Sequence, residues 1–377
     1  MIYLDSAATT LQKPAEVRRA MMHAMETCGN PGRSGHKPAV EGDRILYACR
    51  REAAELFGLS RPEQIIFTQN ATEALNIAIN TVALAGDHGV ISGYEHNSVV
   101  RPLESRKTCQ VAYNVAFSRL FDCKNALEAL KKEVRRDTAF VVYNAVSNVF
   151  GFRLPFWDVD AFCAARGIPL VLDFSQAAGG MEIDCRALKS RCFCCMPGHK
   201  GLYGPQGTGL LLCVNDIKPI SFTQGGTGSN SLDLNQPDFL PDALESGTRN
   251  VPGIAGLLEG IRFVRRVGAE TIGAHERALC RKTAEGLSVI PGVRAYAGPN
   301  QVGVLSFTAR QWGSQELCER MGEQGICLRG GLHCAPLAHK SADTLPDGTV
   351  RISFSAFSTA TEVERFLSCL DRVLKSC

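Results

Sequence analysis

The 377-residue chain lacks several features that would place it in a specialised class of protein. It has almost no excess charge, with 41 Lys+Arg against 38 Asp+Glu and a formal net charge of +3. This balance argues against partners such as nucleic acid or an anionic membrane surface. Its uncharged apolar runs are too short to span a bilayer, and it shows no internal repeat or low-complexity tract. With 45% hydrophobic and 21% charged residues, the composition favours a globular protein with a substantial core.

The first residues, MIYLD, lack the basic segment and the apolar segment of a signal peptide. We therefore expect a cytoplasmic protein. The 16 cysteines agree with that expectation, because free thiols are typical of a reducing compartment. One C-x-x-C spacing occurs at 192–195, but zinc normally requires a second pair. We interpret 192–195 as a structural strand and expect no metal site.

Short apolar runs of β type alternate with helical patterns across the first two thirds of the chain. The expected strands are 64–68, 90–92, 110–115, 139–145, 169–173 and 209–214, and the expected helices are 72–85, 125–134 and 159–166. Such alternation predicts an α/β architecture, with a mostly parallel sheet wound by helices on both sides. Near-continuous apolar strands are typical of burial on both faces.

After about residue 250 the pattern changes to that of a smaller α+β domain. We expect helices at 253–267, 274–287, 314–324 and 361–374, and strands at 293–296, 302–307 and 350–355. The predicted division is a large domain, 15–252, and a small domain made of 1–14 and 253–377. Between them, 225–241 is rich in Gly, Ser, Asn and Asp without periodicity, and we expect a long functional loop.

Lys200 lies in a glycine-rich turn, PGHKGLYGPQGTG, at 197–209. The apolar run before it ends in Asp173. Pyridoxal phosphate requires a lysine amine for its Schiff base and an acid beside its pyridine nitrogen, so this pair predicts a site for that cofactor. Gly198 and Gly201 would let the backbone pass close to the ligand. A nucleotide P-loop is excluded, because no G-K-[ST] closes the run and the lysine precedes the glycines.

Two polar segments follow expected strands in the first hundred residues. In TQNATE, Asn70 and Glu73 form a capping box, and the free helix amides with the Thr72 hydroxyl suit a phosphate. An ordinary capped helix would show the same pattern. His96, in YEHNS, would face the ligand crevice of a parallel sheet, where it could stack on a flat cofactor or move protons. A solvated loop histidine is the alternative.

Two further residues extend this set along the middle of the chain. Asn148, in SNVFG, could hydrogen-bond a phenolate oxygen or simply form a turn. Gln176 lies three residues after Asp173 and could reach the same ring.

A cysteine with basic neighbours lies in the segment CLRGGLHCAP at 327–336. Arg329, His333 and His339 surround Cys334 in the sequence, and cationic neighbours favour the nucleophilic thiolate. A loop cysteine without a function is the alternative. Arg351, in VRISF, suits a bidentate clamp on a substrate carboxylate, or it is a surface arginine of a strand.

Together these segments resemble the class V aminotransferase-fold enzymes, and within them the cysteine desulfurase and selenocysteine lyase family. The resemblance spans nearly the whole chain and implies pyridoxal phosphate-dependent transferase fold type I. The spacing around Cys334 is similar to the branch with a compact, ordered catalytic loop. The matching segments are YLDSAATT (3–10, with Ser6 where the family usually has Asn), NPGRSGH (30–36), DFSQ (173–176), GHK (198–200), RGGLHC (329–334) and the strand of Arg351.

The resemblance implies a role for each matching residue. Lys200 binds pyridoxal phosphate covalently and Asp173 pairs with its ring nitrogen. His96 stacks on the ring and moves protons, and Cys334 takes the sulfur. The remaining contacts are Gln176 and Asn148 at the phenolate, Ala71, Thr72 and His199 at the phosphate, and Arg351, Asn148, Arg329 and His36 at the substrate, with Arg351 clamping the carboxylate.

The segment ESGT at 245–248 resembles the one that reaches the phosphate from a second subunit. The resemblance therefore implies a homodimer in which Thr248 contacts the partner's cofactor. Two positions depart from the family pattern. Pro197 replaces a serine of many relatives and removes one phosphate hydroxyl, while Phe174 is bulkier than the usual small residue.

These implications lead to the predicted function, a cysteine desulfurase. L-cysteine is converted to L-alanine, Cys334 retains the sulfur as a persulfide, and a thiol or an acceptor protein removes it. A selenocysteine lyase or another class V reaction, such as transamination, is the alternative within enzymes, because the segment of Cys334 does not separate sulfur from selenium chemistry. A cofactor-free sulfur-carrier scaffold is an alternative of another class. The acceptor, the pathway and the role of Cys327 stay open.

Overall fold

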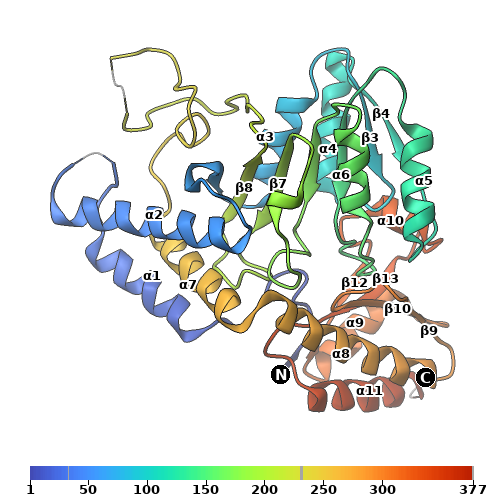
Figure 1. The fold of residues 1–377 in the computed structure, drawn as a ribbon. Coiled ribbons are helices and arrows are strands. Elements are labelled where there is room, and N and C mark those ends of the chain that lie inside the picture. Colours follow the sequence, from blue (N-terminus) through green and yellow to red (C-terminus); the bar gives the residue numbers. More distant parts are fainter. Residues whose placement is uncertain (33, 230–231, 376–377) are drawn as a thin grey trace.

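The computed structural model describes residues 1–32, 34–229 and 232–375, and a seven-stranded sheet lies at its centre (Figure 1). The strand order is β2-β8-β7-β6-β5-β3-β4. Strand β8 runs antiparallel to both β2 and β7, and the other neighbours are parallel. The strands are β2 (Ile65–Thr68), β3 (His88–Ser92), β4 (Ala112–Ala116), β5 (Thr138–Asn144), β6 (Leu170–Asp173), β7 (Cys192–Pro197) and β8 (Gly209–Val214).

Both faces of this sheet are covered by apolar layers. Along β6, Leu170 and Leu172 enter one core cluster, whereas Val171 enters the other, because successive strand side chains point to opposite faces. Helices α3 (Ala71–Val82) and α4 (Asn97–Arg106) cover the second face, and α5 (Cys123–Glu133) and α6 (Phe156–Ala164) cover the first. The predicted doubly wound, mostly parallel sheet is therefore confirmed.

Three long helices flank the end of the sheet near β2 and β8 (Figure 1). They are α1 (Ala15–Thr27), α2 (Lys37–Leu56) and α7 (Val251–Val267), and α7 packs against the other two. The start of α7 follows from its sequence, because the Asn250 side chain accepts a hydrogen bond of 3.0 Å from the Gly253 amide. Gly268, at φ 92°, ends the helix.

A second, four-stranded antiparallel sheet of order β12-β13-β10-β9 forms the core of the smaller part. Its strands are β9 (Val293–Tyr296), β10 (Val304–Ala309), β12 (Arg329–Gly331) and β13 (Thr349–Ser353). Helices α8 (Ala269–Ser288), α9 (Ser314–Glu323) and α11 (Ala360–Lys375) pack around it, and the short α10 (Pro336–Ser341) follows β12.

The N-terminal segment lies beside this smaller sheet. Strand β1 (Ile2–Tyr3) pairs with β11 (Ile326–Cys327), and Asp5 forms a parallel bridge with Ser353. The first residues therefore lie beside β13, although most of the chain separates them in the sequence. The proposed division into 15–252 and 1–14 with 253–377 stays a prediction.

The expected helices and strands are present, and their ends differ from the expected ones by at most five residues. The strand expected at 192–195 is β7, in which the cysteines are buried. Within 225–229 and 232–241 the structure has neither helix nor strand, as expected for a loop. Across the described ranges, no helix is both long and apolar enough to cross a membrane.

Candidate active site

A cavity of about 220 Å³ lies where the carboxyl ends of the central strands meet the smaller sheet. Parallel strands direct their carboxyl ends to one edge, so residues that follow β3, β5, β6 and β7 converge there. The N-terminal segment and the strands β12 and β13 close the other side. The lining residues are Ala7, Ala8, Ala71, Thr72, Leu75, His96, Ser98, Asn144, Val146, Asn148, Asp173, Ser175, Gln176, Pro197, His199, Lys200, Arg329, His333, Cys334 and Arg351.

The cavity brings together most of the residues predicted from the sequence. Lys200 and Cys334 lie 134 positions apart in the numbering, yet they line the same space. The predicted residues in the lining are Ala71, Thr72, His96, Asn148, Asp173, Gln176, His199, Lys200, Arg329, Cys334 and Arg351. Two predicted residues, His36 and Thr248, do not line it.

Lys200 has the electrostatics of an amine that can react at neutral pH. Burial lowers its pKa from 10.5 to about 8, and the nearby positive charges of Arg351 and Arg329 add to this effect, while Asp173 opposes it. The neutral form of a lysine amine is the nucleophile. A substantial fraction of Lys200 is therefore ready to attack a carbonyl carbon near pH 8.

Asp173 ends β6 and is 3% exposed. One carboxylate oxygen accepts a hydrogen bond of 2.8 Å from the Ser175 amide. Burial raises the pKa of Asp173, and the bond from Ser175 only partly offsets this. A protonated ring nitrogen beside the carboxylate would stabilise its charged form further.

His96 lies in a chain of hydrogen bonds that ends at Thr72. The Ser98 amide donates to His96 Nδ1 at 3.0 Å, so Nδ1 is an acceptor. Burial lowers the pKa of His96 to about 4, and the ring is therefore neutral with its proton on Nε2. Ser98 Oγ lies 2.9 Å from His96 Nδ1 and 2.8 Å from Thr72 Oγ1. Sequence reasoning missed Ser98, although its position two residues after His96 was a usable signal.

Buried polar atoms at the cavity are left without a protein partner in the described ranges. His199 Nδ1 and Asn148 Oδ1 are buried without a hydrogen-bond partner among the described residues. Gln176 Nε2 donates to the Ala7 carbonyl at 3.0 Å and thereby fixes its side chain at the lining. Unpaired buried polar atoms are costly in a protein interior, so a ligand with complementary groups is expected here. The residues present therefore fit pyridoxal phosphate.

The glycines beside Lys200 allow close packing within the chain. A side chain at Gly201 would come 2.3 Å from the Ala178 carbonyl oxygen, and one at Gly198 would come 2.2 Å from Thr208 Oγ1. They allow the turn to pack against other parts of the chain. The expectation that they also let the backbone approach a ligand stays a prediction.

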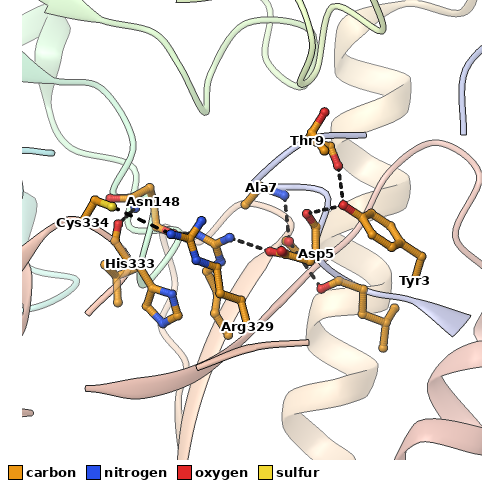
Figure 2. A network of polar contacts seen from close by, with 12 residues as sticks. Tyr3, Asp5, Ala7, Thr9, Asn148, Arg329, His333 and Cys334 are labelled. Atoms are coloured by element: carbon orange, nitrogen blue, oxygen red, sulfur yellow. Dashed lines mark hydrogen bonds and ion pairs between the residues drawn. The ribbon is translucent and has the colours of Figure 1, made fainter. Parts of the chain in front are cut away.

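Cys334 is exposed at the end of a tightly anchored loop. His333 and Cys334 both have positive φ, 50° and 57°, a conformation that L-residues rarely adopt without external restraint. The restraint comes from residues that follow strands of the central sheet: Asn148 Nδ2 donates to the His333 carbonyl at 2.8 Å, and the Asn97 amide donates to the Cys334 carbonyl at 2.7 Å. Figure 2 shows Asn148, His333 and Cys334 side by side. This geometry agrees with a compact, ordered catalytic loop.

The two histidines near Cys334 are neutral, which corrects the expected cluster of cations. Burial lowers the pKa of His333 to about 2 and that of His339 to about 4. His333 instead bonds through Nε2 to the Thr349 carbonyl at 3.0 Å. The cation in contact with the thiol is Arg329, whose Nη2 lies 3.8 Å from Cys334 Sγ.

Arg351 is 1% exposed and already has an acidic partner. Its Nη2 donates to Asp5 Oδ1 at 2.6 Å, and its Nη1 donates to the Asn148 carbonyl at 3.0 Å. The sequence predicted Arg351 as a clamp for a substrate carboxylate but gave no sign of Asp5. The alternative of a surface arginine is wrong, because the side chain is buried.

His36 and Thr248 lie outside the cavity in the single chain. His36 caps α2, where its Nδ1 accepts from the Ala39 amide at 3.3 Å. Thr248 lines a different hollow, together with Thr68 and Arg249. Arg33, in the segment before His36, lies outside the described residues. A contact of Thr248 with a partner's cofactor stays a prediction.

The sequence-family model of the class V aminotransferases matches residues 2–366 of this chain. The chain belongs to the class V aminotransferase family. A curated relative from Methanothermobacter thermautotrophicus, named a probable cysteine desulfurase, is 29% identical over 99% of this chain and 94% of its own length. Another of the same name, from Xylella fastidiosa, is 31% identical over 100% of this chain and 91% of its own length.

A solved structure supports this family assignment in three dimensions. The apo structure of a cysteine desulfurase from Thermococcus onnurineus has a TM-score of 0.92 and 28% sequence identity. The superposition covers 100% of this chain and 95% of the other. The class V fold therefore extends over both the large sheet and the smaller one that carries Cys334.

Proposed function

We propose that this class V enzyme is a pyridoxal phosphate-dependent cysteine desulfurase that converts L-cysteine to L-alanine. The observation that carries the proposal is the convergence of Lys200 and Cys334 on one cavity. A lysine with a lowered pKa suits the cofactor, and a thiol opposite it suits the capture of sulfur. The names of the relatives point to the same reaction.

Lys200 would hold the cofactor covalently, and Asp173 would face its ring nitrogen. Ala71, Thr72 and His199 would surround the phosphate. When bound, pyridoxal phosphate stabilises negative charge at the Cα of an amino acid attached to it. Pro197 contributes no hydroxyl, and the Thr72–Ser98 pair offers two hydroxyls within 2.8 Å of each other at the same end.

Residues of the chain would bind the substrate, move its protons and accept its sulfur. Arg351 binds the substrate carboxylate, and Lys200, once its amine is free, takes the Cα proton. The neutral His96, with its proton on Nε2, can donate but not accept at that atom. Cys334 Sγ forms a bond to the substrate sulfur while the Cβ–S bond breaks, which leaves a persulfide on Cys334. Protonation of the three-carbon fragment then yields L-alanine.

Exposure of Cys334 at the cavity mouth gives a second thiol or an acceptor protein access to the persulfide. We further propose a homodimer, in which Thr248 of each chain approaches the cofactor of the other. The cytoplasmic location stays a prediction from the cysteine content.

The test compares the unsubstituted enzyme with Cys334→Ala and Lys200→Ala, using L-cysteine and L-selenocysteine side by side. Lys200→Ala should lose the visible absorbance of the lysine-bound cofactor. Cys334→Ala should keep that absorbance but release sulfide from cysteine at least about 100-fold more slowly, because it lacks the accepting thiol. Unchanged sulfide release by Cys334→Ala in the presence of dithiothreitol would exclude Cys334 as the acceptor. A preference for selenocysteine would identify a selenocysteine lyase.

A further inference from the structure

The proposed carboxylate clamp has an acidic partner within its own chain. Asp5 Oδ1 lies 2.6 Å from Arg351 Nη2, and 18% of the Asp5 side chain is exposed against 1% of Arg351. The two residues are 346 positions apart. Figure 2 shows Asp5 between Tyr3 and Arg329.

The strand register concentrates positive charge at this place. Arg329 on β12 is directly opposite Arg351 on β13, so the two side chains leave the sheet on the same face. Like charges opposed in this way repel each other. Arg329 Nη2 is directed toward Cys334 Sγ, while Asp5 neutralises Arg351.

Arg351 keeps free donors for a ligand despite its two protein partners. A guanidinium has five N–H groups, of which one on Nη2 serves Asp5 and one on Nη1 serves the Asn148 carbonyl. Its Nε is buried and has no partner in the described part of the chain. A substrate carboxylate can therefore bind Arg351 while Asp5 is still close to it.

A buried cation needs a counter-ion, and both Asp5 and the carboxylate of a ligand can serve as the counter-ion of Arg351. Burial lowers the pKa of Arg351, and the nearby Asp5 carboxylate opposes this in part, because it stabilises the charged form. When a carboxylate ligand binds Arg351, the two anions repel each other. Their effects on the stability of the charged guanidinium are then less than additive.

We propose that Asp5 is the internal counter-ion of Arg351, which holds the clamp in the free enzyme and weakens its affinity for carboxylate ligands. Asp5 is thus a positioning residue that keeps the affinity for the product L-alanine low enough for release. The statement rests on the proposed function only for the identity of the ligand. The competition itself follows from the geometry of Asp5, Arg329 and Arg351.

A purely structural role for Asp5 would give different results. The N-terminal segment has other attachments to β13: the Ser353 amide donates to the Leu4 carbonyl at 2.8 Å, and the Ala7 amide donates to Ser353 Oγ at 2.8 Å. These contacts keep the segment in place when only the charge of Asp5 is removed. Ser353→Ala, which weakens the attachment and leaves the ion pair intact, is the matched control.

The experiment measures binding of L-alanine and of ethylamine, which lacks the carboxylate, by calorimetry on the holoenzyme. Asp5→Asn should bind L-alanine roughly tenfold more tightly, because one like charge within about 6 Å of the ligand carboxylate is removed. Its affinity for ethylamine should not change. Ser353→Ala should bind L-alanine like the unsubstituted enzyme. Equal or weaker binding of L-alanine by Asp5→Asn would overturn the proposal.

A second measurement does not depend on the proposed reaction. The midpoint of thermal unfolding is compared in acetate and in chloride at equal ionic strength. Acetate should raise the midpoint of Asp5→Asn more than that of the unsubstituted protein, because it replaces the missing counter-ion. Asp5→Glu keeps the charge and should behave like the unsubstituted protein in both assays. If Asp5→Glu instead behaved like Asp5→Asn, charge would not be the cause and the proposal would fail. Absence of desulfurase activity in the unsubstituted enzyme would reject the proposed function and leave this comparison valid.

Discussion

Replacing Lys200 by methionine in the cofactor-free protein should stabilise the fold at neutral pH. Burial lowers the pKa of Lys200 from 10.5 to about 8. One pKa unit corresponds to about 1.4 kcal/mol, so burying the charged Lys200 amine lowers the free energy of unfolding by about 3 kcal/mol at pH 7. Because the side chain is only partly buried, solvent in the cavity reduces the cost of its charge. We therefore expect Lys200→Met to raise the free energy of unfolding by roughly 2–3 kcal/mol.

The sign of the pH dependence follows from the protons bound in each state. Between pH 8 and 10.5 the unfolded chain keeps the Lys200 proton that the folded chain has lost. The contribution of Lys200 to the free energy of unfolding therefore rises with pH between 8 and 10.5. Below pH 8 the buried amine is charged, and its full cost destabilises the fold. The gain from Lys200→Met should shrink correspondingly toward pH 10.5.

Urea unfolding of both proteins at pH 7 and pH 10 measures this difference. Lys13→Met is the matched control, because burial also lowers the pKa of Lys13 to about 8. Its Nζ, however, donates to the Thr10 carbonyl and to Thr10 Oγ1 at 2.8 Å each, so this substitution should destabilise the protein. A loss of stability in Lys200→Met at pH 7, or a gain that does not change with pH, would refute the reasoning.

Two further predictions concern the surroundings of the cofactor. Ser98→Ala should weaken binding of pyridoxal phosphate to the cofactor-free protein by roughly five- to tenfold, the effect of about one hydrogen bond, whereas Ser98→Thr should retain most of the affinity. Fluorescence titration measures this, and equal dissociation constants for the serine and alanine forms would contradict it. Gly179→Ala should cost at least about 3 kcal/mol in urea unfolding, because φ is +87° and the new carbon would lie 1.9 Å from the Gly201 carbonyl oxygen. Gly180→Ala, where the nearest atom is the Glu276 carboxylate at 3.4 Å, should cost much less, and similar losses would show that the contact is not responsible.

The central sheet could be predicted because its strands are buried on both faces. The run expected at 169–173 corresponds to β6 (Leu170–Asp173), in which every residue is buried. Helices α1 and α2 were not predicted, although they are long. Helix α1 buries only Val17 and Ala24, so its apolar stripe is too thin to stand out in the sequence.

The candidate site could be predicted to the extent that its chemistry depends on residue type and on position at a strand end. Lys200, Asp173 and His96 were found in this way. Asp5 was not, because no local pattern connects it with Arg351 across 346 positions. The charge of His333 was also predicted wrongly, since a sequence does not show how deeply a histidine is buried.

The sequence by itself determined the alternation of strands and helices, the lysine and acid for a pyridoxal cofactor, and a cysteine in a glycine-rich segment. Those features follow from local periodicity and from the fixed chemistry of side chains. Only the tertiary structure decided that Cys334 shares a cavity with Lys200, that Lys200 has a pKa of about 8, and that Arg351 is paired with Asp5. Desolvation and long-range pairing produce these properties, and both arise when distant segments pack together.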